Sequence, residues 1–333
     1  MIADRLPRIW YSRNGLSQAL RPLSWLFCGL VNLRRLLYRL RILPSRRLPV
    51  PVIVVGNLTV GGTGKTPLVI AIARLLREHG YRPGIVSRGY GGRARRWPQQ
   101  VRPDSDPVMV GDEPILIARQ TGCPMAVGPE RAEAGEALLR HHDCDILLCD
   151  DGLQHYALRR DLEILVIDGE RRFGNGLCLP AGPLREPVRR RETVDFLICN
   201  GTSAHSGELP MRYRIGDLVN LADPTRRVPL SDWQGRPVHG VAGIGHPARF
   251  FETLERAGLQ VTRHPFADHH PYTAADLHFG DDRPVVMTEK DAVKCQRFAR
   301  ANLWYLPIEA QLPDGFAQHF INRIEARHGQ KPA

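Results

Sequence analysis

Residues 51–66 read PVIVVGNLTVGGTGKT, and much of the architecture of the chain follows from them. The first five residues form a short apolar, β-branched run, which is typical of a buried strand. A helical pattern follows over residues 64–79 and is closed by Gly80. A strand, a glycine-rich loop and a helix in this order are the context that a phosphate-binding loop (P-loop) requires. The sequence therefore predicts a site for ATP or GTP.

The chemistry of this loop gives several of its residues a role. Glycines let backbone N–H groups converge on phosphate oxygens, and the N-terminus of the following helix favours the same negative charge. Lys65 would reach the β- and γ-phosphates, and the Thr66 hydroxyl would coordinate Mg²⁺. The strict pattern has a glycine where this chain has Thr59, and a glycine-rich turn without a ligand is the alternative. The predicted nucleotide-binding residues are Thr59, Val60, Gly61, Gly62, Thr63, Gly64, Lys65 and Thr66.

Strand and helix patterns alternate after this loop, which predicts an α/β fold with a doubly wound, mostly parallel sheet of the P-loop type. Further strands are expected at 83–87, 124–128, 146–150, 163–168 and 195–200, with helices at 112–121 and 129–141. A second α/β series has expected strands near 237–243, 260–264, 284–288 and 303–306. The predicted domains are a P-loop nucleotide-binding domain at 49–205, a connection at 206–236 and a smaller second α/β domain at 237–333, which would close a cleft.

Composition excludes several classes of protein. The chain has 333 residues, of which 43% are hydrophobic and 24% charged, so it is neither collagen-like, wholly disordered nor a coiled coil. Its seven cysteines form no C-x-x-C pair, which argues against a disulfide scaffold or a zinc ribbon and favours a reducing compartment. No apolar run approaches the ~18 residues that span a bilayer.

The positive charge is concentrated in residues 1–48, which hold ten arginines and one acid, whereas the whole chain has a net charge of +11. The near-neutral remainder argues against nucleic-acid binding. Leucines in this segment recur at helical spacing, which predicts a basic amphipathic helix lying in an anionic membrane interface. A core-packing helix or half of a coiled-coil seam is the alternative. The expected apolar face comprises Leu23, Leu26, Leu30, Leu33, Leu37 and Leu40, and the far side comprises Ser24, Asn32, Arg35 and Arg39.

Carboxylates and histidines supply three further candidate sites. Asp150 and Asp151 end the strand 146–150, where carboxylates can hold Mg²⁺, although a simple turn is the alternative. Asp112 opens a helix, and a role as the N-cap of that helix is the alternative to catalysis. The run 266–272 contains Asp268-His269-His270 and could be a polar turn. From spacing alone, catalysis at either of these last two places is an open hypothesis.

Six motifs together resemble the tetraacyldisaccharide 4′-kinase family of Gram-negative bacteria. The motifs follow the order of the family and the resemblance covers essentially the whole chain, with Leu153 standing where an aromatic residue is expected. They are Gly61–Thr66, Ser87–Gly92, Gly111–Pro114, Asp150–His155, Gly182–Pro187 and Asp268–His270.

The resemblance implies transfer of the ATP γ-phosphate to the 4′-hydroxyl of an acylated glucosamine disaccharide 1-phosphate, giving lipid IVA in lipid A biosynthesis. It implies ATP and Mg²⁺ as cofactors, an active site between two α/β domains, and a place on the cytoplasmic face of the inner membrane. It implies no obligate protein partner.

The resemblance also implies roles for particular residues. Asp112, paired with His269 or His270 after domain closure, would accept the 4′-hydroxyl proton. The implied metal ligands are Thr66, Asp150, Asp151 and Glu186. The residues implied near substrate or phosphates are Arg88, Tyr90, Arg131, Gln154, His155 and Arg185.

Two other classes of protein compete with this interpretation. A P-loop GTPase or metallochaperone should carry an N-K-x-D-like motif, and the nearest candidate, Thr288-Glu-Lys-Asp291, lacks the asparagine. A non-enzymatic nucleic-acid or membrane adaptor could use the basic arm, but it would leave the P-loop, Asp112 and Asp268–His270 without a task.

Overall fold

The computed structural model describes residues 9–12, 14–201 and 204–328. Arg5, Arg8 and Arg13 of the predicted basic segment lie outside the described residues. The chain divides into two compact units. Unit 1 comprises Met1–Arg88, Cys123–Arg212 and Gln311–Ala333, and unit 2 comprises Gly89–Gly122 and Tyr213–Ala310.

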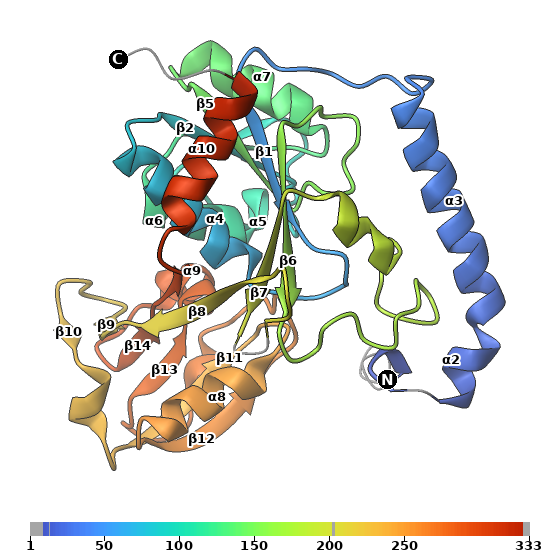
Figure 1. Ribbon diagram of the computed structural model, residues 1–333. Coiled ribbons are helices and arrows are strands. Elements are labelled where there is room, and N and C mark those ends of the chain that lie inside the picture. The colour runs from blue at the N-terminus through green and yellow to red at the C-terminus, as the bar shows by residue number, and fades with distance from the viewer. Residues whose placement is uncertain (1–8, 13, 202–203, 329–333) are drawn as a thin grey trace. The chain divides into compact units, whose positions relative to one another are not determined.

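A parallel sheet forms the centre of unit 1 (Figure 1). Seven of its nine strands lie in the order β8-β7-β6-β1-β5-β2-β4, and their pairings are parallel. The central strand, β1, is buried along its whole length, as its run of β-branched residues predicts. The strands are β1 (Val52–Gly56), β2 (Pro83–Ser87), β4 (Met125–Val127), β5 (Ile146–Asp150), β6 (Leu162–Asp168), β7 (Phe196–Asn200) and β8 (Leu209–Ile215), of which β8 begins in unit 1.

Helices α4 and α7 pack on this sheet through their buried residues. Alternate residues of β1, Val52 and Val54, pack in one cluster with Leu138 of α7, because successive side chains of a strand point to opposite faces. The buried face of α4 packs against β1, β2 and β5. The helices of unit 1 are α2 (Gly15–Ala19), α3 (Arg21–Arg39), α4 (Lys65–Glu78), α7 (Arg131–His141) and α10 (Phe316–His328), with a 3₁₀ turn, η1, at Val188–Thr193.

Unit 2 has its own sheet, in the order β10-β9-β14-β13-β11-β12. Its four larger strands are parallel, and β9 and β10 add antiparallel pairs at one edge. The strands are β9 (Leu218–Asn220), β10 (Arg227–Val228), β11 (Pro237–Ala242), β12 (Gln260–Pro265), β13 (Val285–Thr288) and β14 (Leu303–Leu306). The helices are α5 (Pro107–Val110), α6 (Asp112–Thr121), α8 (Pro247–Arg256) and α9 (Glu289–Cys295). The shorter elements are β3 (Gln99–Val101), β15 (Ile308–Gln311), η2 (Leu230–Trp233), η3 (Ala275–Leu277) and η4 (Gln296–Phe298).

The mostly parallel strands of both units confirm the predicted α/β class, but the chain divides differently from the predicted domains. Residues 89–122 belong to unit 2, because α6 packs on α9, and residues 311–333 belong to unit 1, where Phe316 and Phe320 of α10 pack on Phe196. The predicted connection 206–236 contains β8, β9 and β10. The assignment of residues 89–122 and 311–333 depends on the elements against which their helices pack. Hydrophobic periodicity predicts a helix but not its packing partner.

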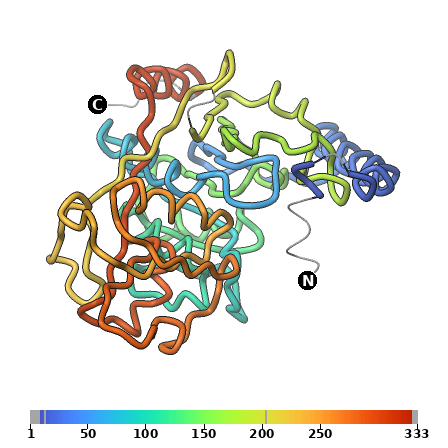
Figure 2. Tube along the Cα trace, turned by 90° about the horizontal axis from the view of Figure 1, so that it is seen from below, coloured from blue at the N-terminus to red at the C-terminus, as the bar shows by residue number. Residues whose placement is uncertain are grey.

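Most leucines of helix α3 are exposed, whereas Ser24, Phe27 and Cys28 face unit 1, so the predicted leucine face is not the side that packs in the core. Leu26 and Leu30 are 62% and 58% exposed, whereas Ser24 is buried and donates a hydrogen bond to the carbonyl of Cys178 (2.8 Å). Both views place α3 beside the segment that contains Cys178 (Figures 1 and 2). No helix among the described residues is both long and apolar enough to cross a membrane.

A disulfide joins Cys28 of α3 to Cys178. The cysteine pattern did not indicate it, because the two residues are 150 positions apart and no motif relates them. The free cysteines among the described residues, Cys123, Cys144, Cys149, Cys199 and Cys295, are buried.

The segment 177–186 folds back on itself and lies along the P-loop. Within the segment, the amide of Gly182 donates to the carbonyl of Cys178 (3.0 Å). Towards the loop, Val60 N–H donates to Pro183 (2.8 Å) and Arg185 N–H donates to Leu58 (2.7 Å). The loop is therefore held by backbone hydrogen bonds on one side.

Gly182 is the position in this segment where a side chain does not fit. A Cβ there would meet the backbone carbonyl oxygen of Leu177 and the Oδ1 of Asn175, each at 2.2 Å. We expect Gly182→Ala to lower the free energy of unfolding by about 1–3 kcal/mol, because backbone cannot move aside as a side chain can. Gly29→Ala is the control: nothing lies within 4 Å of its Cβ in α3, so this variant should gain about 0.5–1 kcal/mol. Urea denaturation measures the free energy of unfolding of both variants. Equal effects of the two substitutions would contradict a steric clash at Gly182.

Candidate active site

The P-loop of unit 1 lies between the end of β1 and the start of α4. Gly61 and Gly64 adopt left-handed φ angles of 105° and 96°, and no atom lies within 4 Å of a Cβ built at Gly61 or Gly62. The Thr63 hydroxyl is buried without a hydrogen-bond partner in the part of the chain that the structure describes. An open glycine turn before a helix N-terminus and a buried polar atom without a partner fit a phosphate ligand.

Lys65 and Arg185 hold Asp151 between them. The Nζ of Lys65 lies 3.6 Å from Asp151 Oδ1 and 3.3 Å from Asn57 Oδ1. The Arg185 Nη1 donates to both oxygens of Asp151, at 3.1 and 3.2 Å. Burial acts to raise the pKa of Asp151, but the charges of Lys65 and Arg185 outweigh it and hold the pKa below its usual value. Asp151 is therefore a carboxylate at neutral pH.

Asp150 lies at the carboxyl end of β5, beside the end of β1. The register pairs Val55 with Asp150, and the Ser87 hydroxyl at the end of β2 donates to Asp150 Oδ2 (3.4 Å). Three parallel strands thus bring Asp150 and Ser87 to the edge of the sheet from which the P-loop leaves.

Glu186 is buried and linked to the P-loop through Gln154. Its carboxylate accepts hydrogen bonds from the Tyr156 hydroxyl and from Gln154 Nε2 (3.3 Å), and lies 3.6 Å from the Nε of Arg190. Gln154 Nε2 also donates to the carbonyl of Asn57 (3.1 Å). Burial and then the Glu186 charge raise the pKa of Tyr156 to about 12, so the tyrosine remains a donor.

A cluster of arginines surrounds His155. Burial, followed by the charges of Arg131, Arg160, Arg34 and Arg88, lowers the pKa of His155 to about 4. Arg131 is buried, and its Nε makes no hydrogen bond with any described residue. This part of unit 1 therefore combines a neutral imidazole with an excess of positive charge, which suits a polyanionic ligand.

Asp112 and His269 form a carboxylate–imidazole pair inside unit 2. The Nδ1 of His269 lies 3.0 and 3.1 Å from the two oxygens of Asp112, which is only 4% exposed. Asp112 is the first residue of α6, after the N-cap Gly111, and its Oδ1 also accepts from the Glu113 amide (2.9 Å). Tyr90 lies against the imidazole, with ring centroids 5.1 Å apart.

The structure corrects one expectation about this pair and distinguishes two alternatives that the sequence left open. Both residues belong to unit 2, so their contact does not require the expected domain closure. His270 lies elsewhere: its Nε2 is 3.4 Å from Asp276, and its ring packs on Phe266. Adjacent side chains diverge, and sequence spacing could not decide which of the two histidines meets Asp112.

Positive neighbours set the ionisation of the pair. Burial acts to raise the pKa of Asp112, but the His269 hydrogen bond and the charges of Lys290 and Lys294 together lower it to about 2. Burial acts to lower the pKa of His269, but the hydrogen bond and charge of Asp112 raise it overall.

Sequence reasoning did not assign roles to several residues at these sites. Lys290 contacts Glu113, Asp268 and His269, and Lys294 lies 3.7 Å from Asp112. The signal available for Lys290 was its place in Thr288–Asp291, a segment that belongs to the family resemblance but to which no residue role was attached. In unit 1, Asn57, Tyr156 and Arg190 were not predicted.

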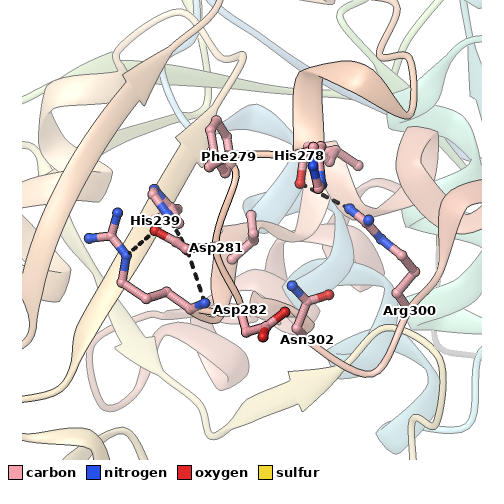
Figure 3. Close-up of a pocket in the computed structure, with 10 residues that line it drawn as sticks. His239, His278, Phe279, Asp281, Asp282, Arg300 and Asn302 are labelled. Carbon is pink, nitrogen blue, oxygen red and sulfur yellow. Dashed lines mark hydrogen bonds and ion pairs between the residues drawn. The ribbon is translucent and has the colours of Figure 1, made fainter.

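Unit 2 also contains a cavity of about 230 Å³ away from the predicted residues (Figure 3). Both nitrogens of His239, which lies on its wall, have partners: Nδ1 is 2.9 Å from His264, and Nε2 is 3.0 Å from Asp281. Asp281 also binds Arg283 (2.7 Å). The described residues contain no cluster of three or more His, Cys, Asp or Glu side chains arranged to hold a metal ion.

A P-loop in a mostly parallel sheet, with carboxylates at a neighbouring strand end, is typical of proteins that bind a nucleoside triphosphate, a class that includes kinases. A family model described as tetraacyldisaccharide-1-P 4′-kinase matches residues 16–325. The chain belongs to the tetraacyldisaccharide 4′-kinase family and is a kinase, which confirms the family suggested by the motifs.

Relatives support this assignment over nearly the full length. The tetraacyldisaccharide 4′-kinase of Nitrosococcus oceani is 54% identical, over 96% of this chain and 94% of the relative. That of Alkalilimnicola ehrlichii is 56% identical, over 92% of this chain and 93% of the relative. A crystal structure of LpxK from Aquifex aeolicus in complex with ATP is 30% identical, covers 93% of this chain and 99% of its own, and superposes with a TM-score of 0.78.

The contact between Asp112 and His269 leads to a titration prediction. We expect His269→Gln to raise the Asp112 pKa above about 2, because it removes the hydrogen bond that helps to hold that pKa down. A folded-state pKa below the unfolded value stabilises the fold above pH ~4, and this stabilisation is lost as the pH falls towards 2. The difference in stability between wild type and variant should therefore shrink over that interval.

The ¹³C resonance of the Asp112 carboxyl group measures the titration directly. His270→Gln is the matched control, because His270 contacts Asp276 and should leave the titration of Asp112 unchanged. An identical Asp112 titration in wild type and His269→Gln would refute the electrostatic account.

Proposed function

We propose that this kinase transfers the γ-phosphate of ATP to the 4′-hydroxyl of tetraacyldisaccharide 1-phosphate, giving lipid IVA. The observation that carries the proposal is the P-loop of unit 1, with Lys65 paired to Asp151 at the start of α4. The choice of acceptor is supported by the family model that matches residues 16–325.

Unit 1 binds the nucleotide in this proposal. Residues 59–66 surround the phosphates, and Lys65 neutralises charge on them. Thr66, Asp150, Asp151 and Glu186 are the residues that would hold Mg²⁺, since hydroxyl and carboxylate oxygens are its preferred protein ligands. Mg²⁺ typically uses one or two carboxylates together with phosphate oxygens, and it would supply neutralisation of the charge on the phosphates.

Unit 2 supplies the group that handles the acceptor proton. The Asp112 carboxylate accepts a hydrogen bond from the 4′-hydroxyl and orients its oxygen. As that oxygen forms its bond to the γ-phosphorus, the bond to the leaving oxygen of ADP breaks and the hydroxyl proton moves to Asp112. A carboxylate with a pKa of about 2 is a weak base, so it contributes orientation of the hydroxyl as well as proton transfer, which suits a loose transition state.

Arginines and their neighbours are proposed to bind the anionic groups of the reactants. Arg131 is buried with an Nε that bonds to no described residue, and His155 is held neutral beside it. The complete proposed set is Arg88, Tyr90, Arg131, Gln154, His155 and Arg185.

Helix α3 is proposed to lie in the cytoplasmic face of the inner membrane, where the lipid acceptor resides. Its exposed side includes Trp25, Leu26 and Leu30, and the arginines of the same segment would attract anionic lipid. The contacts of Ser24 and Cys28 with Cys178 fix the opposite side to unit 1.

Transfer of labelled γ-phosphate from ATP to tetraacyldisaccharide 1-phosphate in detergent micelles tests the reaction. We expect wild type to make labelled lipid and Lys65→Ala to make none. Asp112→Asn should lose about 10²–10⁴-fold in kcat while still binding ATP, because its role concerns only the acceptor. Unlabelled lipid after incubation with folded, ATP-binding wild type would reject the proposed acceptor.

Sedimentation with anionic vesicles tests the membrane surface. The double variant Leu26→Glu/Leu30→Glu should bind about tenfold more weakly or worse, because it removes two exposed leucines and adds charge to the lipid-facing side. Ile215→Glu is the control, since Ile215 is an exposed apolar residue outside α3. Equal sedimentation of the double variant and wild type would exclude α3 as the membrane contact.

A further inference from the structure

Lys290 is a largely buried lysine beside the Asp112–His269 pair. It is the second residue of α9, and its side chain is 16% exposed. Its Nζ lies 2.9 Å from Glu113 Oε1, 3.3 Å from Asp268 Oδ1 and 3.3 Å from His269 Nε2. One ammonium group therefore meets two carboxylates and one imidazole nitrogen.

The ammonium group of Lys290 determines which ring nitrogen of His269 carries the proton. Burial acts to lower the pKa of Lys290, but the charges of Glu113 and Asp112 raise it overall, so the side chain is cationic. An ammonium group carries three N–H donors and no acceptor. The three contacts match these three donors, and the Nε2 of His269 must accept. Its proton is then on Nδ1, which donates to Asp112.

The other charged groups favour a second proton on this imidazole. Asp112 lies on its Nδ1 side, and Asp268 Oδ1 is 3.8 Å from Nε2. Lys290 opposes protonation by its charge and by occupying the lone pair of Nε2. The groups that border the pair in unit 2 are Asp112, Glu113, Asp268, Lys290, Lys294 and the ring of Tyr90.

We propose that Lys290 is a positioning residue that holds His269 as the neutral Nδ1–H tautomer. This inference rests on the proposed function, in which Asp112 receives the acceptor hydroxyl. A neutral imidazole donates one N–H to Asp112. The remaining lone pairs of the Asp112 carboxylate are then available to the acceptor hydroxyl. An imidazolium in its place would hold Asp112 in an ion pair and make it a poorer proton acceptor.

The first experiment observes the tautomer directly, without substrate. Long-range ¹H–¹⁵N spectra of ¹⁵N-histidine-labelled full-length protein report which nitrogen of His269 carries the proton, and His269→Gln assigns its signals. We expect Nδ1–H and an unprotonated Nε2 in wild type at pH 8. In Lys290→Met the midpoint of the second protonation should rise by about one pH unit, because a nearby positive charge has been removed. Lys290→Arg keeps that charge and should restore the wild-type midpoint.

The second experiment measures the pH dependence of kcat. In Lys290→Met the acid limb of the profile should move to higher pH by the same amount as the His269 midpoint. In Lys290→Arg the acid limb should lie at the wild-type pH. The KM for ATP should stay constant in both variants. A merely structural lysine would lower kcat by one factor at all pH values. Thermal unfolding identifies any variant that does not fold, and Lys290→Gln then replaces Lys290→Met.

Three results would overturn the proposal: Nε2–H in wild type, an unchanged His269 midpoint in a folded neutral variant, or an unchanged acid limb. Failure of the proposed function has a different signature. In that case the spectra would show the expected tautomer and its shift in Lys290→Met, but wild type would make no labelled lipid.

Discussion

The parallel register of β1 with β5 is the constraint on which the nucleotide site depends. It sets Val55 beside Asp150, so the strand that leads into the P-loop ends next to the strand that carries the two aspartates. Side chains alternate between the faces of a strand, and a slip of one residue would turn Asp150 to the opposite face. The hydrophobic cores on both sides of these buried strands oppose such a slip. The apolar packing of the sheet and the placement of the charged groups are thus fixed by the same hydrogen-bond ladder.

Two of the carboxylates near the nucleotide loop lie against cations. Asp151 lies between Lys65 and Arg185, and Glu186 lies next to Arg190. Removing one member of such a pair leaves a buried charge uncompensated, which is far more costly than the pair itself is favourable. These pairs therefore hold the two carboxylates in fixed orientations.

The sequence predicted most of the buried parallel strands closely, because buried strands and amphipathic helices have distinct periods, but it took β8, β9 and β10 for a connection. It also predicted the P-loop and brought Asp112 and the 269–270 histidines forward as candidates. It could not choose between His269 and His270, because that choice depends on a left-handed backbone at His269 (φ 60°). Nor could it find Lys290, whose partners come from α6 and from the loop before Tyr272 and meet only in the folded unit.

The polypeptide passes between the two units four times. Residues 89–122 belong to unit 2 although the segments on either side belong to unit 1, and residues 311–333 belong to unit 1 again. Neither unit is a continuous stretch of sequence, so no single cut in the gene releases one of them intact. Each passage is also a covalent tether, and four tethers restrict the relative displacements open to the units far more than one linker would. A nascent chain cannot complete unit 1 until the last helix, α10, has been synthesised.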